Sequence, residues 1–306
     1  MRKKAIVISV VILAVLAAIL IPLFCVPRSV VDKVVVVPLS GSITAGDYSL
    51  SGSAITPGLV RNYLTKAEKD TAVKAIVLRV ESPGGEIEPC QEISLEIDRI
   101  KQKKPVVVSM AGMAASGGYY ISAKADKIVA LPTTQTGSIG VIATIVNVGE
   151  LLDKLGIQVE TFTGGKYKDM YWGLRELTAE EKEIMQGLVD EYYEDFVNVV
   201  AEGRGLSKEA VSELATGQIY TGARAKELGL IDELGDLHRA IELAEELAGV
   251  EAAVVEYYRP PRFTLWSLLG LLEAIKARIS GLSAQDVMLL EILNHSYRQP
   301  VFLYLS

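Results

Sequence analysis

The sequence predicts an α/β domain whose strands pair in parallel. Short apolar runs typical of strands occur at residues 34–37, 74–80 and 105–109, and segments typical of helices lie between them at residues 58–70 and 88–102. Strands that alternate with helices favour a parallel sheet, because each helix returns the chain to the same end of the sheet. Half of the 306 residues are hydrophobic, so a sizeable core is possible.

The first half of the chain supports this order element by element. The opening run of four consecutive valines is typical of a buried strand. The helix expected at residues 88–102 carries Ile93, Ile97 and Ile100 on one face. After the third strand, residues 114–122 predict the end of a strand, a tight turn and the start of a helix.

The second half predicts one more strand and three helices. Residues 156–162 have a strand pattern. A capping box at residues 178–181 opens a long helix that we expect to reach about residue 203. A short helix, ended by Gly229, is expected at residues 221–228, and an amphipathic helix is expected at residues 235–248.

The amino-terminal segment predicts a membrane anchor. Residues 5–24 contain no charge, and a helix of this length crosses the ~30 Å hydrocarbon core of a bilayer. Basic residues at positions 2–4 favour a cytoplasmic amino terminus, which places the rest of the chain on the extracytoplasmic side. The alternatives are a cleaved signal peptide, which normally has a shorter apolar run, and lipidation at Cys25, whose preceding residues are bulky.

Three parts of the chain are therefore expected. A single-pass anchor covers residues 1–28, the main domain covers 29–258, and an amphipathic carboxyl-terminal tail covers 259–306. The tail packs against the core or a subunit in one interpretation, and docks on lipid or a partner in the other.

Charge and composition exclude several classes of function. Without the first 28 residues the chain holds 27 basic and 38 acidic residues, a net charge of −11, which argues against a nucleic-acid partner. The two cysteines, Cys25 and Cys90, are not expected to pair. No cluster has metal-ligand spacing, so neither a metal nor another cofactor is expected.

Ser116 is the candidate nucleophile. It lies where a strand is expected to turn into a helix, with alanines before it and glycines after it. Small neighbours let a carbonyl approach the hydroxyl, and the free amides of a helix start can stabilise an oxyanion. The alternative is that this segment only packs a tight turn.

A nucleophilic serine needs a base, and lysine fits this chain better than histidine. His238 lies on a predicted amphipathic helix and His295 in the tail, and neither has a convincing partner. Lys166 and Lys168 lie together in a loop rich in glycine and lysine. An ordinary lysine, with a pKa of about 10.4, is protonated at neutral pH, so a lysine base needs burial to release its proton.

Two further turns carry candidate polar groups. Residues 82–85 end a strand with Ser-Pro-Gly-Gly, where a glycine amide could face a substrate oxyanion or only form a type II turn. Residues 136–140 form a second small-residue turn, in which Ser138 either orients the base or caps the turn.

Taken together and in order, these motifs resemble the signal peptide peptidase A (protease IV) family in its short, single-copy form. The resemblance covers about residues 33–250 and rests on five segments. They are residues 82–85, 115–122, 136–141, 165–169 and 219–235.

The resemblance implies a fold like Clp protease and crotonase, built of stacked ββα units, and a Ser–Lys dyad. Ser116 matches the family nucleophile, and Lys168 matches the base better than Lys166 does. Ser138 matches the serine that orients the lysine. Gly85 and Gly117 match the oxyanion-hole residues. The family forms rings or domes with substrate grooves between subunits, so a homo-oligomer is expected.

The function implied is that of a membrane-anchored serine endopeptidase that degrades residual signal peptides. One alternative is a related Ser–Lys protease that acts on stomatin-like membrane proteins. Another is a crotonase-type acyl-CoA enzyme, which an outward-facing anchor disfavours. A third is an inactive scaffold that only binds apolar peptides.

Overall fold

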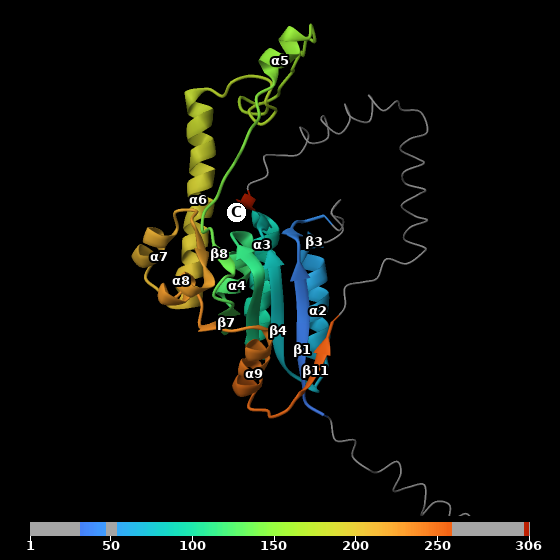
Figure 1. Ribbon diagram of the computed structural model, residues 1–306. Helices are drawn as coiled ribbons and strands as arrows, with labels where there is room; N and C mark the ends of the chain where they lie inside the picture. The colour runs from blue at the N-terminus through green and yellow to red at the C-terminus, as the bar shows by residue number, and fades with distance from the viewer. Residues whose placement is uncertain (1–30, 47–53, 259–302, 306) are drawn as a thin grey trace, which may run out of the picture.

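A computed structural model describes residues 31–46, 54–258 and 303–305 of the chain (Figure 1). The main sheet has eight strands in this part of the chain. Six follow the order β10-β7-β6-β4-β1-β11, β8 pairs with β6, and β9 pairs with β8. All pairs are parallel except β8 with β9, so the predicted parallel α/β domain is confirmed. The strands are β1 (Lys33–Ser40), β4 (Val73–Ser82), β6 (Val106–Ala115), β7 (Lys127–Ala130), β8 (Gln135–Gly137), β9 (Ile219–Thr221), β10 (Glu233–Leu234) and β11 (Val254–Tyr257).

A second, smaller sheet continues from the carboxyl ends of β1 and β4. Its order is β12-β5-β2-β3. The strands are β2 (Ser42–Ile43), β3 (Ala54–Ile55), β5 (Gly84–Glu86) and β12 (Leu303–Leu305). The strand β5 takes the place of the simple turn expected after residue 82, and it pairs antiparallel with β12. The two sheets together make a mixed α/β architecture.

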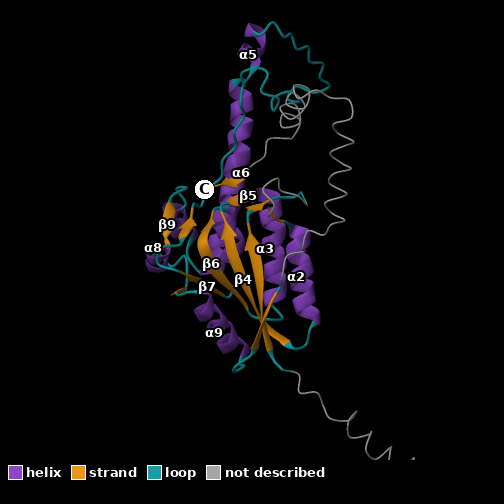
Figure 2. Cartoon of the chain, turned by 45° about the vertical axis from the view of Figure 1, so that its right-hand side comes forward, coloured by secondary structure: helices purple, strands orange, loops and turns teal. Residues whose placement is uncertain are grey.

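Helices cover both faces of the main sheet (Figure 2). They are α2 (Pro57–Lys69), α3 (Ile87–Lys101), α4 (Gly117–Ala123), α5 (Gly149–Lys154), α6 (Ala179–Arg204), α7 (Lys208–Leu214), α8 (Gly222–Glu227) and α9 (Leu237–Ala248). The helices expected at 58–70, 88–102, 178–203, 221–228 and 235–248 are thus confirmed within one or two residues at each end.

Strand β1 shows why its sequence is an unbroken apolar run. Val35 and Val37 point into the core that contains α2 and α3, whereas Val34 and Val36 point into the core that contains α9. All four are buried, because a parallel sheet covered on both faces has no solvent-facing side.

Residues 141–178 form an arm that projects away from the sheet and carries α5 at its far end (Figure 1). Its two limbs join where Val148 N–H donates to the carbonyl of Gly173, at 2.7 Å. The chain returns to the core along the 26-residue helix α6. Many apolar side chains of the arm are exposed, including Ile142, Val146, Leu151, Leu155, Ile157, Val159, Phe162 and Trp172.

The strand expected at residues 156–162 is wrong. This segment has no regular secondary structure and is exposed throughout. A strand requires a neighbour to pair with, and no described segment lies against this part of the arm as a strand. A local apolar pattern cannot supply that information.

The predicted anchor at residues 1–28 and nearly all of the predicted tail lie outside the described residues. Among the described helices, none is long and apolar enough to span a bilayer. From the tail, the structure describes only the backbone strand β12.

Candidate active site

Ser116 occupies a strained junction between β6 and α4, as the sequence predicts. Its backbone has φ 52° and ψ −119°, a region that non-glycine residues rarely adopt. Its N–H donates to the carbonyl of Gly137 at 2.8 Å, and its carbonyl accepts from Tyr120 N–H at 2.8 Å. Strain of this kind costs ~1–3 kcal/mol and persists only where the surroundings enforce it, most often at functional sites.

The hydroxyl of Ser116 is buried and has no hydrogen-bond partner among the described residues. A buried hydroxyl without a partner is destabilising by ~1–3 kcal/mol. Strain and an unpaired hydroxyl at the same residue together favour a functional role over simple turn packing.

The start of α4 requires glycine because other atoms approach too closely for a side chain. A Cβ added to Gly117 would lie 2.6 Å from Cys90 Sγ, and one added to Gly118 would lie 2.8 Å from the carbonyl oxygen of Ser82. The glycines therefore let α4 pack against the end of β4 and against α3, with Ser116 at its first turn.

The structure brings both predicted oxyanion-hole glycines to Ser116. A Cβ added to Gly117 would lie 3.1 Å from Gly85 N, so the two backbones are neighbours. Gly85 itself has no room for a side chain, because its Cβ would lie 1.9 Å from the carbonyl oxygen of Ile43.

Ser138 lies on the other side of the junction. It follows Gly137, whose carbonyl accepts from Ser116 N–H, and it is buried with a positive φ of 50°. Its own N–H donates to the carbonyl of Gln218 at 2.8 Å. The residue is thus close to the candidate nucleophile in the fold, as the motif suggests.

The thiol of Cys90 also lies next to this junction, since a Cβ added to Gly117 would meet its Sγ. Burial raises the pKa of its thiol well above the ordinary value. A thiol that stays protonated is a poor nucleophile, so Ser116 is the better candidate.

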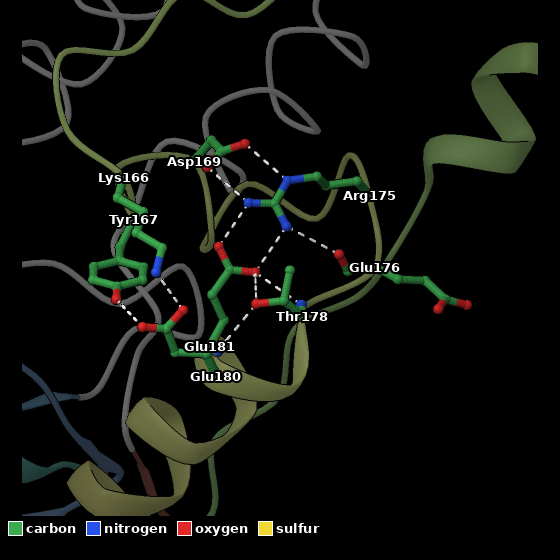
Figure 3. Close-up of polar contacts among 8 residues, drawn as sticks. All are labelled: Lys166, Tyr167, Asp169, Arg175, Glu176, Thr178, Glu180 and Glu181. Carbon is green, nitrogen blue, oxygen red and sulfur yellow. Dashed lines mark hydrogen bonds and ion pairs between the residues drawn. The ribbon is translucent and has the colours of Figure 1, made fainter.

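The structure does not bring the candidate lysines to Ser116. Lys166 and Lys168 lie on the arm, in the loop before α6, and Lys168 is exposed. Lys166 forms an ion pair with Glu180, and this hydrogen bond raises its pKa (Figure 3). At neutral pH a lysine with a raised pKa is more fully protonated and so is less available as a general base, which favours Lys168 over Lys166.

A charged network holds the loop that carries Lys168, and the sequence analysis did not find it (Figure 3). Arg175 donates to both oxygens of Asp169 and to both oxygens of Glu181. These bonds lower the pKa of Asp169 and hold that of Glu181 at about 2, with help from Thr178. The predicted capping box involved Glu181, but no motif indicated Arg175.

A cavity of about 260 Å³ lies on the arm beside this network. It is lined by Gly149, Leu152, Asp153, Ile157, Val159, Thr161, Asp169, Trp172, Leu174 and Arg175. It is separate from the junction at Ser116, and we assign no ligand to it.

The chain's own β12 occupies one edge of β5. Tyr304 pairs with Gly85 and Leu305 with Gly84, in antiparallel register. The edge of β5 therefore accepts an extended peptide directly beside the junction at Ser116, which is the geometry of β-strand addition.

Among the described residues, no group of three or more His, Cys, Asp or Glu side chains is arranged to hold a metal. His238 is exposed on α9 and lies 3.3 Å from Glu242, as expected for a surface histidine. His295 lies outside the part of the chain that the structure describes.

Comparison with protein families identifies the fold and then the family. The Clp protease family matches residues 55–137, which agrees with the expected Clp-protease-like α/β fold. Peptidase family S49 matches residues 98–251, about half of the chain. The chain belongs to peptidase family S49, and the resemblance drawn from its motifs is confirmed.

Several relatives agree with this assignment. A candidate protease of Methanocaldococcus jannaschii is 44% identical over 64% of this chain and 63% of its own length. A candidate signal peptide peptidase SppA of Enterococcus faecium is 44% identical over 64% of this chain and 59% of its own. A candidate protease of Synechocystis is 42% identical over 66% of this chain and 74% of its own. The chain thus spans about three fifths of the first two relatives.

Proposed function

We propose that the protein is a serine endopeptidase with Ser116 as nucleophile and Lys168 as general base. The observation that carries this proposal is the buried, unpartnered hydroxyl of Ser116 at a strained strand–helix junction. The adjacent backbones of Gly85 and Gly117 support it, because two amides at such a junction suit an oxyanion.

In the proposed reaction, neutral Lys168 Nζ takes the proton from Ser116 Oγ, which bonds to the peptide carbonyl carbon. The N–H groups of Gly85 and Gly117 donate to the oxyanion. The C–N bond then breaks, and Lys168 returns its proton to the leaving amine. Water hydrolyses the acyl ester and restores the serine, while Ser138 orients the lysine.

The dyad requires Lys168 to reach a buried serine from an exposed arm. The exposed apolar side chains of the arm support docking against a second copy of the chain, since such surfaces are usually covered. A homo-oligomer, such as the ring or dome expected from the family, would also exclude water from the lysine.

The proposed substrates are apolar peptides, in particular signal peptides left in the membrane after secretion. The pairing of β12 with β5 supports an extended peptide at this edge. A relative named as a candidate signal peptide peptidase favours this substrate class over stomatin-like proteins. The uncharged residues 5–24 support a single-pass location in the cell membrane, with the main domain outside.

Hydrolysis of a fluorogenic signal peptide by the full chain tests this proposal. Ser116→Ala and Lys168→Ala should each abolish turnover, whereas Ser212→Ala and Lys208→Ala, on the exposed surface of α7 outside the arm, should leave it unchanged. Full activity in either dyad variant would exclude the Ser–Lys mechanism. A parallel assay with a stomatin-derived peptide separates the two substrate classes.

A further inference from the structure

Arg175 joins Asp169, the residue after Lys168, to the start of α6. We infer that Arg175 is a positioning residue for the proposed base, fixing the loop that carries Lys168 to the amino-terminal turn of α6. The inference rests on the proposed function, because it assigns a role relative to Lys168.

The guanidinium of Arg175 forms two bidentate pairs at once (Figure 3). Toward Asp169, Nε lies 2.9 Å from Oδ2 and Nη2 lies 2.8 Å from Oδ1. Toward Glu181, Nη1 lies 2.8 Å from Oε2 and Nη2 lies 2.7 Å from Oε1. Only arginine has a planar fork that suits two carboxylates in this way, so lysine cannot reproduce the arrangement.

Glu181 is itself held firmly, so it can serve as a fixed point. Its side chain is almost fully buried and accepts from both the N–H and the hydroxyl of Thr178, at 2.9 and 3.1 Å. Thr178 in turn caps α6 by accepting from the N–H of Glu181. The arginine therefore ties a loop to a rigid helix end.

The carboxyl-terminal half of α6 packs against α4, the helix that follows the candidate nucleophile. Tyr120, on the helix that Ser116 opens, donates to Asp195 of α6 at 2.6 Å, and its ring packs against Phe196 with centroids 5.1 Å apart. The helix α6 thus contacts α4 in its carboxyl-terminal half and the lysine-bearing loop at its amino-terminal turn. Misplacement of such a loop by 1 Å can lower a rate by ~10²-fold.

The network also sets the charge around the loop. With Arg175 present, Asp169 and Glu181 leave a net charge of −1; without it, the net charge is −2. Nearby Lys166 and Glu180 neutralise each other as an ion pair. Extra negative charge near the loop favours the protonated form of the lysine amine. Loss of Arg175 should therefore move the pH at which activity rises on the acid side of the pH–rate profile to a higher value.

Steady-state kinetics of the full chain across pH tests the inference with Arg175→Gln, Arg175→Lys and Asp169→Asn. We expect Arg175→Gln to lower kcat by ~10- to 100-fold with little change in KM, and to shift the acid side of the pH–rate profile to higher pH. Arg175→Lys should return the acid side of the pH–rate profile to its original pH, because the positive charge is kept, but it should not restore the full kcat. Asp169→Asn should lower kcat but move the acid side of the profile in the opposite direction, because it removes a negative charge.

The control is Arg224→Gln, which breaks a surface ion pair with Glu227 on α8, away from the arm. If Arg175→Gln and Asp169→Asn keep kcat within twofold and leave the acid side of the pH–rate profile in place, while Lys168→Ala is inactive, the inference is wrong and the dyad stands. If activity does not depend on Lys168 at all, the proposed function fails, and the role of Arg175 fails with it. A folding defect in Arg175→Gln, seen as a lowered melting temperature, leaves Asp169→Asn as the deciding variant.

Discussion

The sheet core and the arm hold the two halves of the candidate dyad in opposite ways. The core encloses Ser116 completely and leaves its hydroxyl without a described partner. The arm exposes Lys168 and is organised by charged side chains rather than by a continuous apolar core. Under the proposed mechanism, the candidate nucleophile is preformed in the single chain, and we expect the candidate base to become functional only when the arm is covered.

Packing explains the first half of this comparison. Close backbone contacts at Gly85, Gly117 and Gly118 leave no freedom at the junction, so the core can maintain strain at Ser116. The ion pairs of the arm depend on the partly exposed side chain of Arg175, and ion pairs with an exposed partner contribute little to stability. The arm should therefore respond to pH and salt far more than the core does.

The largest effect is expected from a side chain at Gly85. Gly85→Ala would force a Cβ to within 1.9 Å of a backbone carbonyl, so β5 must shift. We expect turnover to fall by ~100-fold or more, because a proposed oxyanion donor moves, together with a loss of ~1–3 kcal/mol in the free energy of unfolding. Peptide hydrolysis and denaturant unfolding measure the two effects.

The matched control is Gly58→Ala, because a Cβ at this helical position meets nothing within 4 Å. It should keep full activity. Equal behaviour of the two variants would show that the junction is not tightly packed.

A smaller effect is expected from relieving the strain at Ser116. Ser116→Gly and Ser116→Ala both remove the hydroxyl, but only glycine tolerates φ 52° and ψ −119° without steric cost. We expect the glycine variant to be about 1 kcal/mol more stable than the alanine variant in denaturant unfolding. An alanine variant of equal or greater stability would argue against backbone strain.

Removal of the β12 strand tests whether this strand competes with substrate at the edge of the core. A chain that ends at residue 302 leaves the β5 edge open to substrate. We expect KM for a peptide to fall by about two- to fivefold with kcat unchanged, because a larger fraction of the molecules then has the β5 edge free to bind the peptide. An unchanged KM would mean that β12 does not compete with substrate.

The smallest effect is a local loosening of the arm at low pH. Bonds from Arg175 lower the pKa of Glu181 from 4.5 to about 2 in the folded chain. The stabilisation is therefore present above the unfolded pKa and is lost as pH falls from about 5 to about 2. Hydrogen exchange should show residues 164–181 opening in this pH range before the β1 and β4 strands open. Opening of both regions at the same pH would contradict the difference proposed between the arm and the core.

The sequence predicted the elements whose signals are local. The helix α3 follows from its apolar spacing and α6 from its capping box, and Ser116 followed from the small residues around it. The strand expected at 156–162 failed because strand formation depends on a partner, which only the fold decides. Arg175 was missed for the same reason, since its two carboxylates lie six residues away on either side and meet only in the folded loop.

Covalent labelling of the full chain by a fluorophosphonate, followed by peptide mapping, tests the central claim most directly. The dyad predicts a label on Ser116 that is lost in Lys168→Ala and kept in Lys166→Ala. A label on another residue, or equal labelling of Ser116 without Lys168, would contradict it.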